Sequence, residues 1–188
     1  NTEKFHVSYK SPHATFKVLS SYDDNVEAGK LIEEVIKRLK KLRKYTNGKY
    51  FGTNKSEDPS PLVRDMINRF NVMFDPDNIK EIDPLNNKGM TSYVENKGEV
   101  IGLCVRDKEG KLHDINTVMF VVLHEVSHII NNEMQHETPF WRKFKWLVSE
   151  AINSDVYIPI DYGKNIESYC GISVYYSPYY DKTLSKID

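Results

Sequence analysis

Apolar residues recur at helical spacing between residues 25 and 45, and mostly charged residues fill the positions between them. The apolar positions are Ile32, Val35 or Ile36, Leu39 and Leu42. Intervals of three and four residues place these side chains on one face, which predicts an amphipathic helix that begins at Asp24 or Asn25. Residues 46–60 are polar and contain glycine and asparagine, so we expect a loop there.

Residues 14–24 alternate between apolar and polar side chains and predict one strand before this helix. A second helix is expected with Ser60 as its N-cap and Pro61 at its first position, because the first turn of a helix has no need of the amide hydrogen that proline lacks. This helix should end before Asp75 and Pro76.

The pattern changes to strands and turns over residues 79–112. Within this stretch, residues 92–107 predict a hairpin whose turn lies at residues 96–98. A third, strongly apolar helix should then begin near Asp114 or Asn116, since both residue types favour the N-cap position.

A fourth helix is expected with Thr138 as its N-cap and Pro139 at its first position. The tail at residues 156–188 is rich in tyrosine and reads as irregular. No internal repeat or low-complexity linker divides the chain, so we predict a single domain over residues 1–188 with its core at about 80–155. The order of the elements predicts an α+β fold, in which a small mixed or antiparallel sheet packs on the helices.

The composition is that of an ordinary globular domain, with 39% hydrophobic and 28% charged residues and a net charge of −1. This balance argues against a polycation that binds nucleic acid over its whole surface. The apolar run at residues 118–123 is far shorter than the roughly 20 residues that span a bilayer, so we expect no membrane segment in this chain.

Two cysteines, Cys104 and Cys170, are the only ones in the sequence, and they form no closely spaced metal-binding pair. We expect them to be reduced thiols rather than a disulfide, as in a reducing compartment. The protein should accordingly be intracellular, in the cytoplasm or the nucleus.

The third helix carries the pattern H-E-x-x-H at residues 124–128. His124 and His128 lie one turn apart on the same helix face, so both imidazoles can bind one zinc ion. Glu125 lies beside them and can act as the general base that takes a proton from a zinc-activated water. The pattern alone is equally compatible with an ordinary surface helix.

Three further features favour a zinc site. The residues around the pattern are strongly apolar, and a buried polar trio needs a reason such as a metal ion. The preceding hairpin can hold a peptide as an added strand, for which we expect the strand at residues 99–107 to pair with the substrate, with Gly102 permitting close approach. His136 supplies a third imidazole and leaves a fourth position for water.

The third ligand is a choice between His136 and Glu150. The extended metzincin pattern is excluded, because Asn131 and Met134 stand where that pattern has glycine and histidine. Glu150, on the fourth helix, is the ligand that a gluzincin would use. His136 is favoured, since it follows the active helix at a turn that can bring it back over the metal.

A family resemblance becomes visible at this point. Residues 124–141, "HEVSHIINNEMQHETPFW", resemble the WLM and SprT-like zinc metallopeptidases, including those of large DNA viruses. The matching positions are His124, Glu125, His128, His136, Phe140 and Trp141. The resemblance covers roughly residues 80–150 and implies a zincin-like fold, one catalytic zinc ion and peptide-bond hydrolysis. The best-known relatives degrade proteins crosslinked to DNA, and a viral member could be carried in the virion.

Other polar and aromatic residues receive more modest interpretations. Phe140 and Trp141 are expected to be core residues under the active helix. One of four tail tyrosines could donate to the charge that develops on the substrate, although packing is the simpler role for each: Tyr162, Tyr169, Tyr175 and Tyr176. Glu133 and Glu137 are near enough to support the imidazoles. The remaining histidines are not expected to be ligands: His6, His13 and His113.

The main hypothesis is therefore a zinc-dependent endopeptidase with a protein or peptide substrate. The six basic residues within Lys37–Lys44 could follow phosphates, so DNA is a conceivable second partner, although a solvated helix face is the simpler interpretation. Two alternatives stay open. One is a zincin-like module that binds DNA or protein around a structural zinc, and the other is a narrow peptidase that processes one viral protein.

Overall fold

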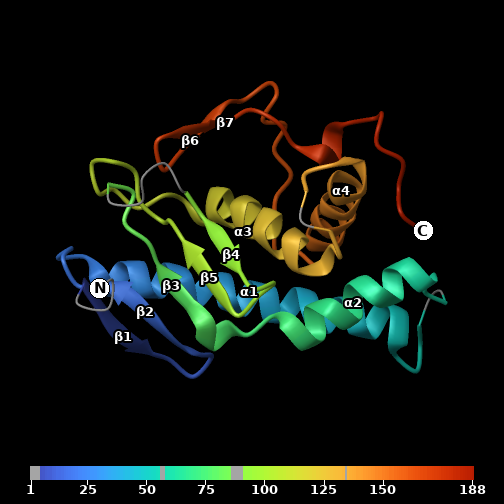
Figure 1. Ribbon diagram of the computed structural model, residues 1–188, viewed down its shortest axis with the longest axis horizontal. Helices are drawn as coiled ribbons and strands as arrows, with labels where there is room; N and C mark the ends of the chain where they lie inside the picture. The colour runs from blue at the N-terminus through green and yellow to red at the C-terminus, as the bar shows by residue number, and fades with distance from the viewer. Residues whose placement is uncertain (1–4, 56–57, 86–90, 134) are drawn as a thin grey trace.

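The computed structural model describes residues 5–55, 58–85, 91–133 and 135–188 (Figure 1). Its helices are α1 (Asn25–Phe51), α2 (Pro61–Met73), α3 (Ile115–Ile130) and α4 (Thr138–Asn153), with the short 3-10 helices η2 (Pro76–Asn78) and η3 (Pro178–Tyr180). Its strands are β1 (His6–Lys10), β2 (Thr15–Leu19), β3 (Ile79–Glu81), β4 (Tyr93–Glu95), β5 (Val100–Leu103), β6 (Glu167–Tyr169) and β7 (Ile172–Val174). Residues 86–90 of the predicted strand-and-turn stretch lie outside the described residues, as does Met134.

The first five strands form one mixed sheet in the order β1-β2-β3-β5-β4. β1 and β2 are antiparallel, as are β4 and β5, whereas β3 runs parallel to both of its neighbours. In Figure 1, α1 runs behind this sheet, and α3 lies beside β4 at the sheet edge. The predicted α+β fold with a small mixed sheet is confirmed.

The predicted hairpin is present, with its turn at residues 96–98, but its second strand is not the one that can receive a substrate. β5 is paired with β3 on one side and with β4 on the other, so both of its edges are occupied. The expected space over Gly102 is also filled, since a Cβ atom there would come within 2.5 Å of the Tyr93 ring. The sheet edge beside α3 that a further strand could join is that of β4.

α1 is longer than predicted and includes residues that we expected in a loop. Thr46 and Tyr50 are buried on the same face as the apolar positions, and the Tyr50 hydroxyl donates to a carboxylate of α4. These tertiary contacts outweigh the weak helix propensity of Gly48. At the other end, the Asp24 side chain makes no capping bond and pairs with Arg106 instead.

The other helices begin close to the expected residues. Ser60 Oγ and Asp114 Oδ1 each accept a hydrogen bond from the backbone N–H three residues later, at 3.3 Å and 3.0 Å. α4 starts one residue earlier than expected, because Thr138 already lies in the helix and Glu137 occupies the N-cap position.

One apolar core joins the sheet to the helices. Residues from every layer contribute to it, among them Phe16 of β2, Leu39 of α1, Phe70 of α2, Leu123 of α3 and Leu147 of α4. Each of these side chains is almost completely buried. Within the described ranges, no helix combines the length and apolarity needed to cross a bilayer.

The tail is more ordered than expected, because β6 and β7 form a second hairpin. Its turn consists of Cys170 and Gly171, whose φ angles of 48° and 83° lie in the left-handed region. Cys170 is disulfide-bonded to Cys104, directly after β5, so the expectation of free thiols is wrong. The two cysteines are 66 residues apart in the sequence, and the packing of Tyr169 beside Cys104 helps to bring them together.

Candidate metal centre

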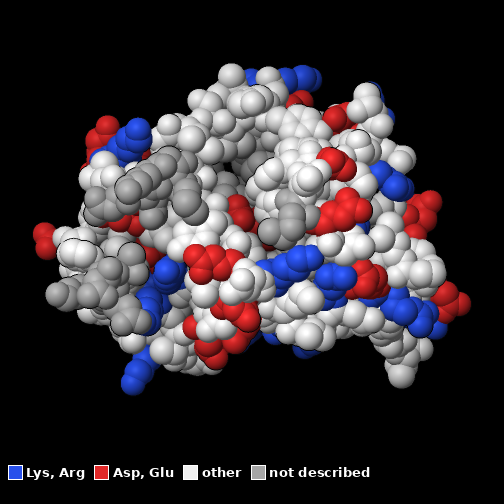
Figure 2. Space-filling model, in the orientation of Figure 1, with Lys and Arg blue, Asp and Glu red and all other residues white. Residues whose placement is uncertain are grey.

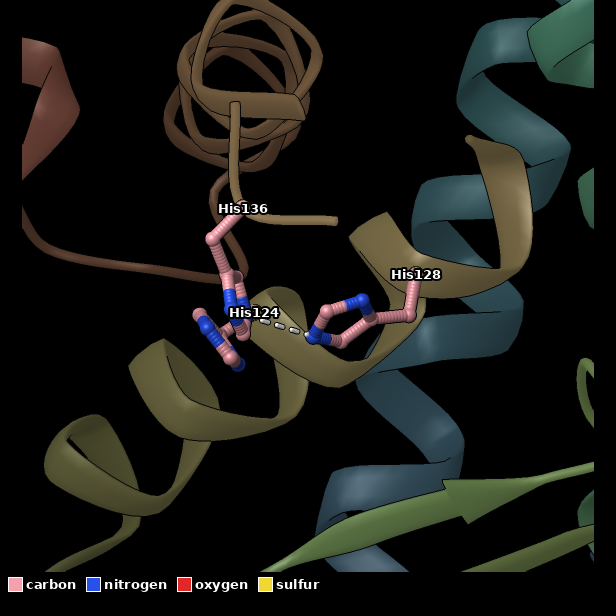
Figure 3. A group of neighbouring side chains, drawn as sticks. All are labelled: His124, His128 and His136. Carbon is pink, nitrogen blue, oxygen red and sulfur yellow. Dashed lines mark hydrogen bonds between the residues drawn. The ribbon is translucent and has the colours of Figure 1, made fainter. Parts of the chain in front are cut away.

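Three histidines converge at the C-terminal half of α3. His124 and His128 project from the same face of this helix, and His136 reaches them from the segment before α4 (Figure 3). One ligand atom from each lies within 4.8 Å of the other two. The closest pair is His128 Nε2 and His136 Nε2, at 2.9 Å. The structure thus brings together the three predicted metal ligands.

The chemistry of this donor set fits a zinc ion. A tetrahedral zinc with bonds of about 2.0–2.1 Å holds its ligand nitrogens roughly 3.3 Å apart, so small side-chain rotations suffice to adapt the three rings. Burial, followed by the neighbouring His124 and His136, lowers the pKa of His128 to about 4. Burial also lowers the pKa of His136. Both rings are therefore neutral at neutral pH and keep a lone pair for a metal.

Glu125 is buried beside the histidines, with only 5% of its surface exposed. Its Oε1 atom lies 3.3 Å from His124 Nδ1. Burial raises the pKa of this carboxyl above its ordinary value, and the contact with His124 acts in the opposite direction. A carboxylate with a raised pKa at the edge of a cavity is suited to accept and return a proton.

Aromatic side chains of α4 pack against the imidazoles. Phe140 is fully buried, and its ring centroid lies 4.5 Å from that of His128 and 4.8 Å from that of His136. The predicted core role of Phe140 is confirmed. Trp141 also packs against the core, but it is only partly buried and lines a cavity. Its Nε1 donates to the His136 carbonyl at 3.2 Å.

Glu150, the competing ligand, lies elsewhere in the structure. Its Oε1 accepts from Lys49 Nζ at 2.9 Å and from the Tyr50 hydroxyl at 3.2 Å, which ties α4 to the end of α1. Glu133 lines the cavity beside His136, but no hydrogen bond of the described residues joins Glu133 or Glu137 to an imidazole. The described hydrogen bonds therefore do not support the predicted role of these two glutamates in orienting the imidazoles.

The other three histidines are outside the cluster, as expected. His6 Nε2 contacts the Glu81 carbonyl at 2.7 Å. His113 lies before α3, and its Nε2 accepts from the Cys170 N–H at 2.9 Å. His113 therefore helps to hold the second hairpin in place. His13 lies elsewhere, and its backbone carbonyl accepts a hydrogen bond from Lys40.

Two cavities meet at the histidine cluster. One, of about 550 Å³, lies between α3, α4 and the second hairpin, and the other, of about 500 Å³, lies between α3 and β4. Ser92, His124 and Glu125 line both. Together they form a cleft that passes the metal site on either side, and Figure 2 shows this face hollowed beneath the hairpin.

The four tail tyrosines have different environments. Tyr162 is buried in the core, and the Tyr176 hydroxyl donates to Asp181 Oδ2 at 2.7 Å. The Tyr169 hydroxyl donates to the Cys104 carbonyl at 2.5 Å and lies 2.7 Å from Ser92 Oγ. No local sequence pattern predicts this pairing. Tyr175 is exposed and lines the larger cavity.

Most of the basic stripe on α1 is engaged within the protein. Arg38, Lys40 and Arg43 donate to the backbone carbonyls of Val156, His13 and Phe74. Lys37 pairs with Glu34 at 3.6 Å. Lys41 and Lys44 make no hydrogen bond or ion pair within the described part of the chain. On the face in Figure 2, basic and acidic residues are interspersed.

The model of the WLM domain family matches residues 36–177. The chain belongs to the WLM-domain family. Within this family it is of the large-DNA-virus type. It is 30% identical over 177 residues to uncharacterized protein R325 of Acanthamoeba polyphaga mimivirus, a match that covers 91% of this chain and 84% of that protein. It is also 30% identical over 132 residues to uncharacterized protein 042R of Invertebrate iridescent virus 3, covering 70% and 75%.

The fold of this WLM-domain protein is similar to that of Wss1 from Saccharomyces cerevisiae. Two crystal structures of Wss1, one of them a mutant, match 78% of this chain with TM-scores of 0.54 and 0.52. Sequence identity is 19% and 20%, and the matches cover 96% and 94% of the Wss1 chains. Family and fold together place the chain in a zincin-like protease family.

Proposed function

We propose that this WLM-domain protein is a zinc-dependent endopeptidase. The observation that carries the proposal is the convergence of three imidazoles beside a buried carboxyl, at the point where two cavities meet. A purely structural zinc site has no use for Glu125, whose burial without a cationic partner carries a free-energy cost.

His124, His128 and His136 would hold the zinc ion. When bound there, zinc supplies Lewis acidity, which polarises the scissile carbonyl and makes water a better nucleophile at neutral pH. The three histidines leave one position of a tetrahedral ion open to water or substrate. Phe140 keeps the rings of His128 and His136 in place by packing against both.

Glu125 would move the proton in this reaction. Its carboxylate accepts a proton from the attacking water and then donates it to the nitrogen of the leaving amine. The raised pKa favours this double role, because a carboxyl that holds a proton more tightly can carry it between two sites. Tyr175 lines the same cavity, and its hydroxyl makes no hydrogen bond to another described residue, whereas the Tyr176 hydroxyl is bound to Asp181. Tyr175 is therefore the tail tyrosine best suited to donate to the developing charge.

The edge of β4 would bind the substrate backbone. β4 borders α3, and the residues at its two ends line the cavities differently. Ser92, before β4, lines both cavities, whereas Asn96 and Lys97, after it, line only the smaller one. A peptide added antiparallel to β4 extends across the metal site and places its C-terminal part in the larger cavity.

The first test combines zinc analysis with a substitution. Purified protein should contain about one zinc per chain. Glu125→Gln should keep that zinc and cleave an unfolded protein at least about 100-fold more slowly, because a general base contributes on the order of 10²–10⁴-fold. Glu109→Gln, in an exposed loop, is the matched control and should cleave like the parent. Cleavage by Glu125→Gln at the parental rate would refute the mechanism.

Proteins bound to DNA are the substrate class that the family resemblance suggests. The same basic protein should be digested alone, with single-stranded DNA and with double-stranded DNA. Faster cleavage with DNA, lost on raising the salt concentration, would support this class. Equal rates in all three mixtures would instead favour a peptidase that does not depend on DNA, in keeping with the few cations of α1 that remain available.

A further inference from the structure

The larger cavity is apolar over most of its lining. Its walls include Phe120 and Val121 of α3, Trp141 and Phe144 of α4, and Ile172 of β7. His124 and Glu125 line it on the side of the metal centre, where it meets the smaller cavity. With about 550 Å³, this space is large enough for a phenylalanine or leucine side chain beside the reacting bond.

The outer wall of this cavity is residues 172–176, and both of its ends are fixed. At one end, the Cys104–Cys170 disulfide and the hydrogen bonds of Tyr169 tie the hairpin to the sheet. At the other end, the Tyr176 ring packs edge-on against Trp141, with ring centroids 5.3 Å apart. The wall is therefore a strap between the sheet and α4, which in Figure 1 arches over α3.

We propose that this cavity is a specificity pocket for a large apolar side chain of the substrate, and that the Cys104–Cys170 bridge holds its outer wall in place. The proposal rests on the proposed peptidase function. The cavity is continuous with the metal centre, because it opens on Glu125 and His124. A side chain that enters it therefore belongs to a substrate residue next to the scissile bond.

The direction of β4 indicates which residue this is. β4 begins at the larger cavity, near Ser92, and ends at the smaller cavity, near Lys97. An antiparallel substrate therefore enters the larger cavity with the residue on the C-terminal side of the scissile bond. The smaller cavity, which contains Glu133 and Lys97, receives the preceding residues.

The test uses a peptide library and mass spectrometry to locate the cleaved bonds. Zinc-loaded protein should cut preferentially before Phe, Leu or Tyr, at least about tenfold faster than before Gly or Asp, since burial of such a side chain favours binding by an order of magnitude or more. Val121→Phe fills the cavity and should reduce that preference at least about fivefold while zinc content stays the same. Val72→Phe is the matched control, because Val72 is exposed on α2, outside the cavity, and should change nothing.

The bridge is tested with Cys170→Ser and, without substitution, by reducing the parent with a phosphine. Loss of the bridge should weaken the apolar preference several-fold while zinc content is unchanged. Ile172→Asp changes the cavity wall and leaves both cysteines in place. It should not unfold the protein, because half of Ile172 is already exposed. This variant should cleave before Phe more slowly than the parent does, because the carboxylate makes the cavity wall polar. A flat preference in the parent, or one that Val121→Phe and Ile172→Asp leave intact, would overturn the pocket. An unchanged preference after reduction would overturn the role of the bridge.

Binding separates this proposal from the proposed function. Peptides with Phe or Gly at the variable position are titrated into Glu125→Gln, with and without Val121→Phe, and Trp141 in the cavity wall reports occupancy by fluorescence. Tighter binding of the Phe peptide that depends on Val121 supports the pocket even if the parent cleaves nothing. Cleavage without any such discrimination supports the peptidase and refutes the pocket.

Discussion

Two buried glutamates show how surroundings decide the role of a residue. Glu125 and Glu150 are almost equally hidden, at 5% and 4% exposure. Glu150 is paired with Lys49 and Tyr50, so its carboxylate is committed to holding α4 on α1. Among the described residues, the only side chain within hydrogen-bond distance of the Glu125 carboxyl is the His124 imidazole, and Glu125 lines the cleft. The first arrangement is structural, and the second is suited to proton transfer.

Substitutions at the assigned third ligand, His136, and at the rejected one, Glu150, should therefore have opposite effects on zinc binding and on stability. His136→Ala should weaken zinc binding by about 100-fold or more, because one of three ligands is lost. Glu150→Gln should keep the zinc and lower the free energy of unfolding by about 1–3 kcal/mol, because Lys49 loses a charged partner. Zinc competition with a chelator and chemical denaturation measure the two effects. Zinc loss in Glu150→Gln combined with retention in His136→Ala would show that the ligand assignment is wrong.

At the scale of elements, Arg106 joins three parts of the fold. Its guanidinium donates to Glu81 of β3 at 2.8 Å, to Asp24 at the start of α1, and to the Gly110 carbonyl at 3.2 Å. The Arg106 and Glu81 side chains are completely buried, so neither charge can be hydrated if the other is removed. This network fixes the loop between β5 and α3, and with it the start of the active helix.

Arg106→Met should therefore destabilise the protein by about 3–5 kcal/mol, because Glu81 would remain as an uncompensated buried charge. Adding Glu81→Met should recover part of this loss, since no charge is then left in the core. Chemical denaturation with the disulfide intact measures both. Arg64→Met, on the exposed face of α2, is the control and should stay within about 0.5 kcal/mol of the parent. If Arg106→Met alone were as stable as the parent, this role of the network would be contradicted.

At the scale of the whole molecule, zinc should stabilise the fold. The histidines lie on two segments, α3 and the loop before α4, so a bound ion crosslinks them only in the folded state. At a free zinc concentration of about 100 times the dissociation constant, the gain is about 2.7 kcal/mol. For a chain of this length it corresponds to a rise of roughly 5–10 °C in Tm.

Thermal denaturation with zinc and with a chelator checks this. The rise should disappear in His136→Ala and should be reversed by the chelator in the parent. Glu125→Gln serves as the control that retains the effect, because it removes the base and leaves the ligands. An equal rise in His136→Ala would place zinc at another site.

What the sequence alone could predict was local. Ser60 is predictable as a cap, and Asp114 as one of two candidates with Asn116, since such side chains bond within their own first turn. The ligand pair His124 and His128 follows from the pitch of one helix. The third ligand, His136, is expected because it lies eight residues beyond His128, close enough for a turn to return it, and because it matches the pattern of the resembling family.

Contacts between distant segments were decided by the tertiary structure alone. The Cys104–Cys170 bridge spans 66 residues, and nothing near either cysteine signals it. The true length of α1 depends on the burial of Thr46 and Tyr50, and the edge position of β4 depends on the parallel pairing of β3 with β5. The local sequence determined the arrangement of His124, Glu125 and His128, because their geometry belongs to one helix. The cleft around them was determined by long-range packing, which local patterns do not encode.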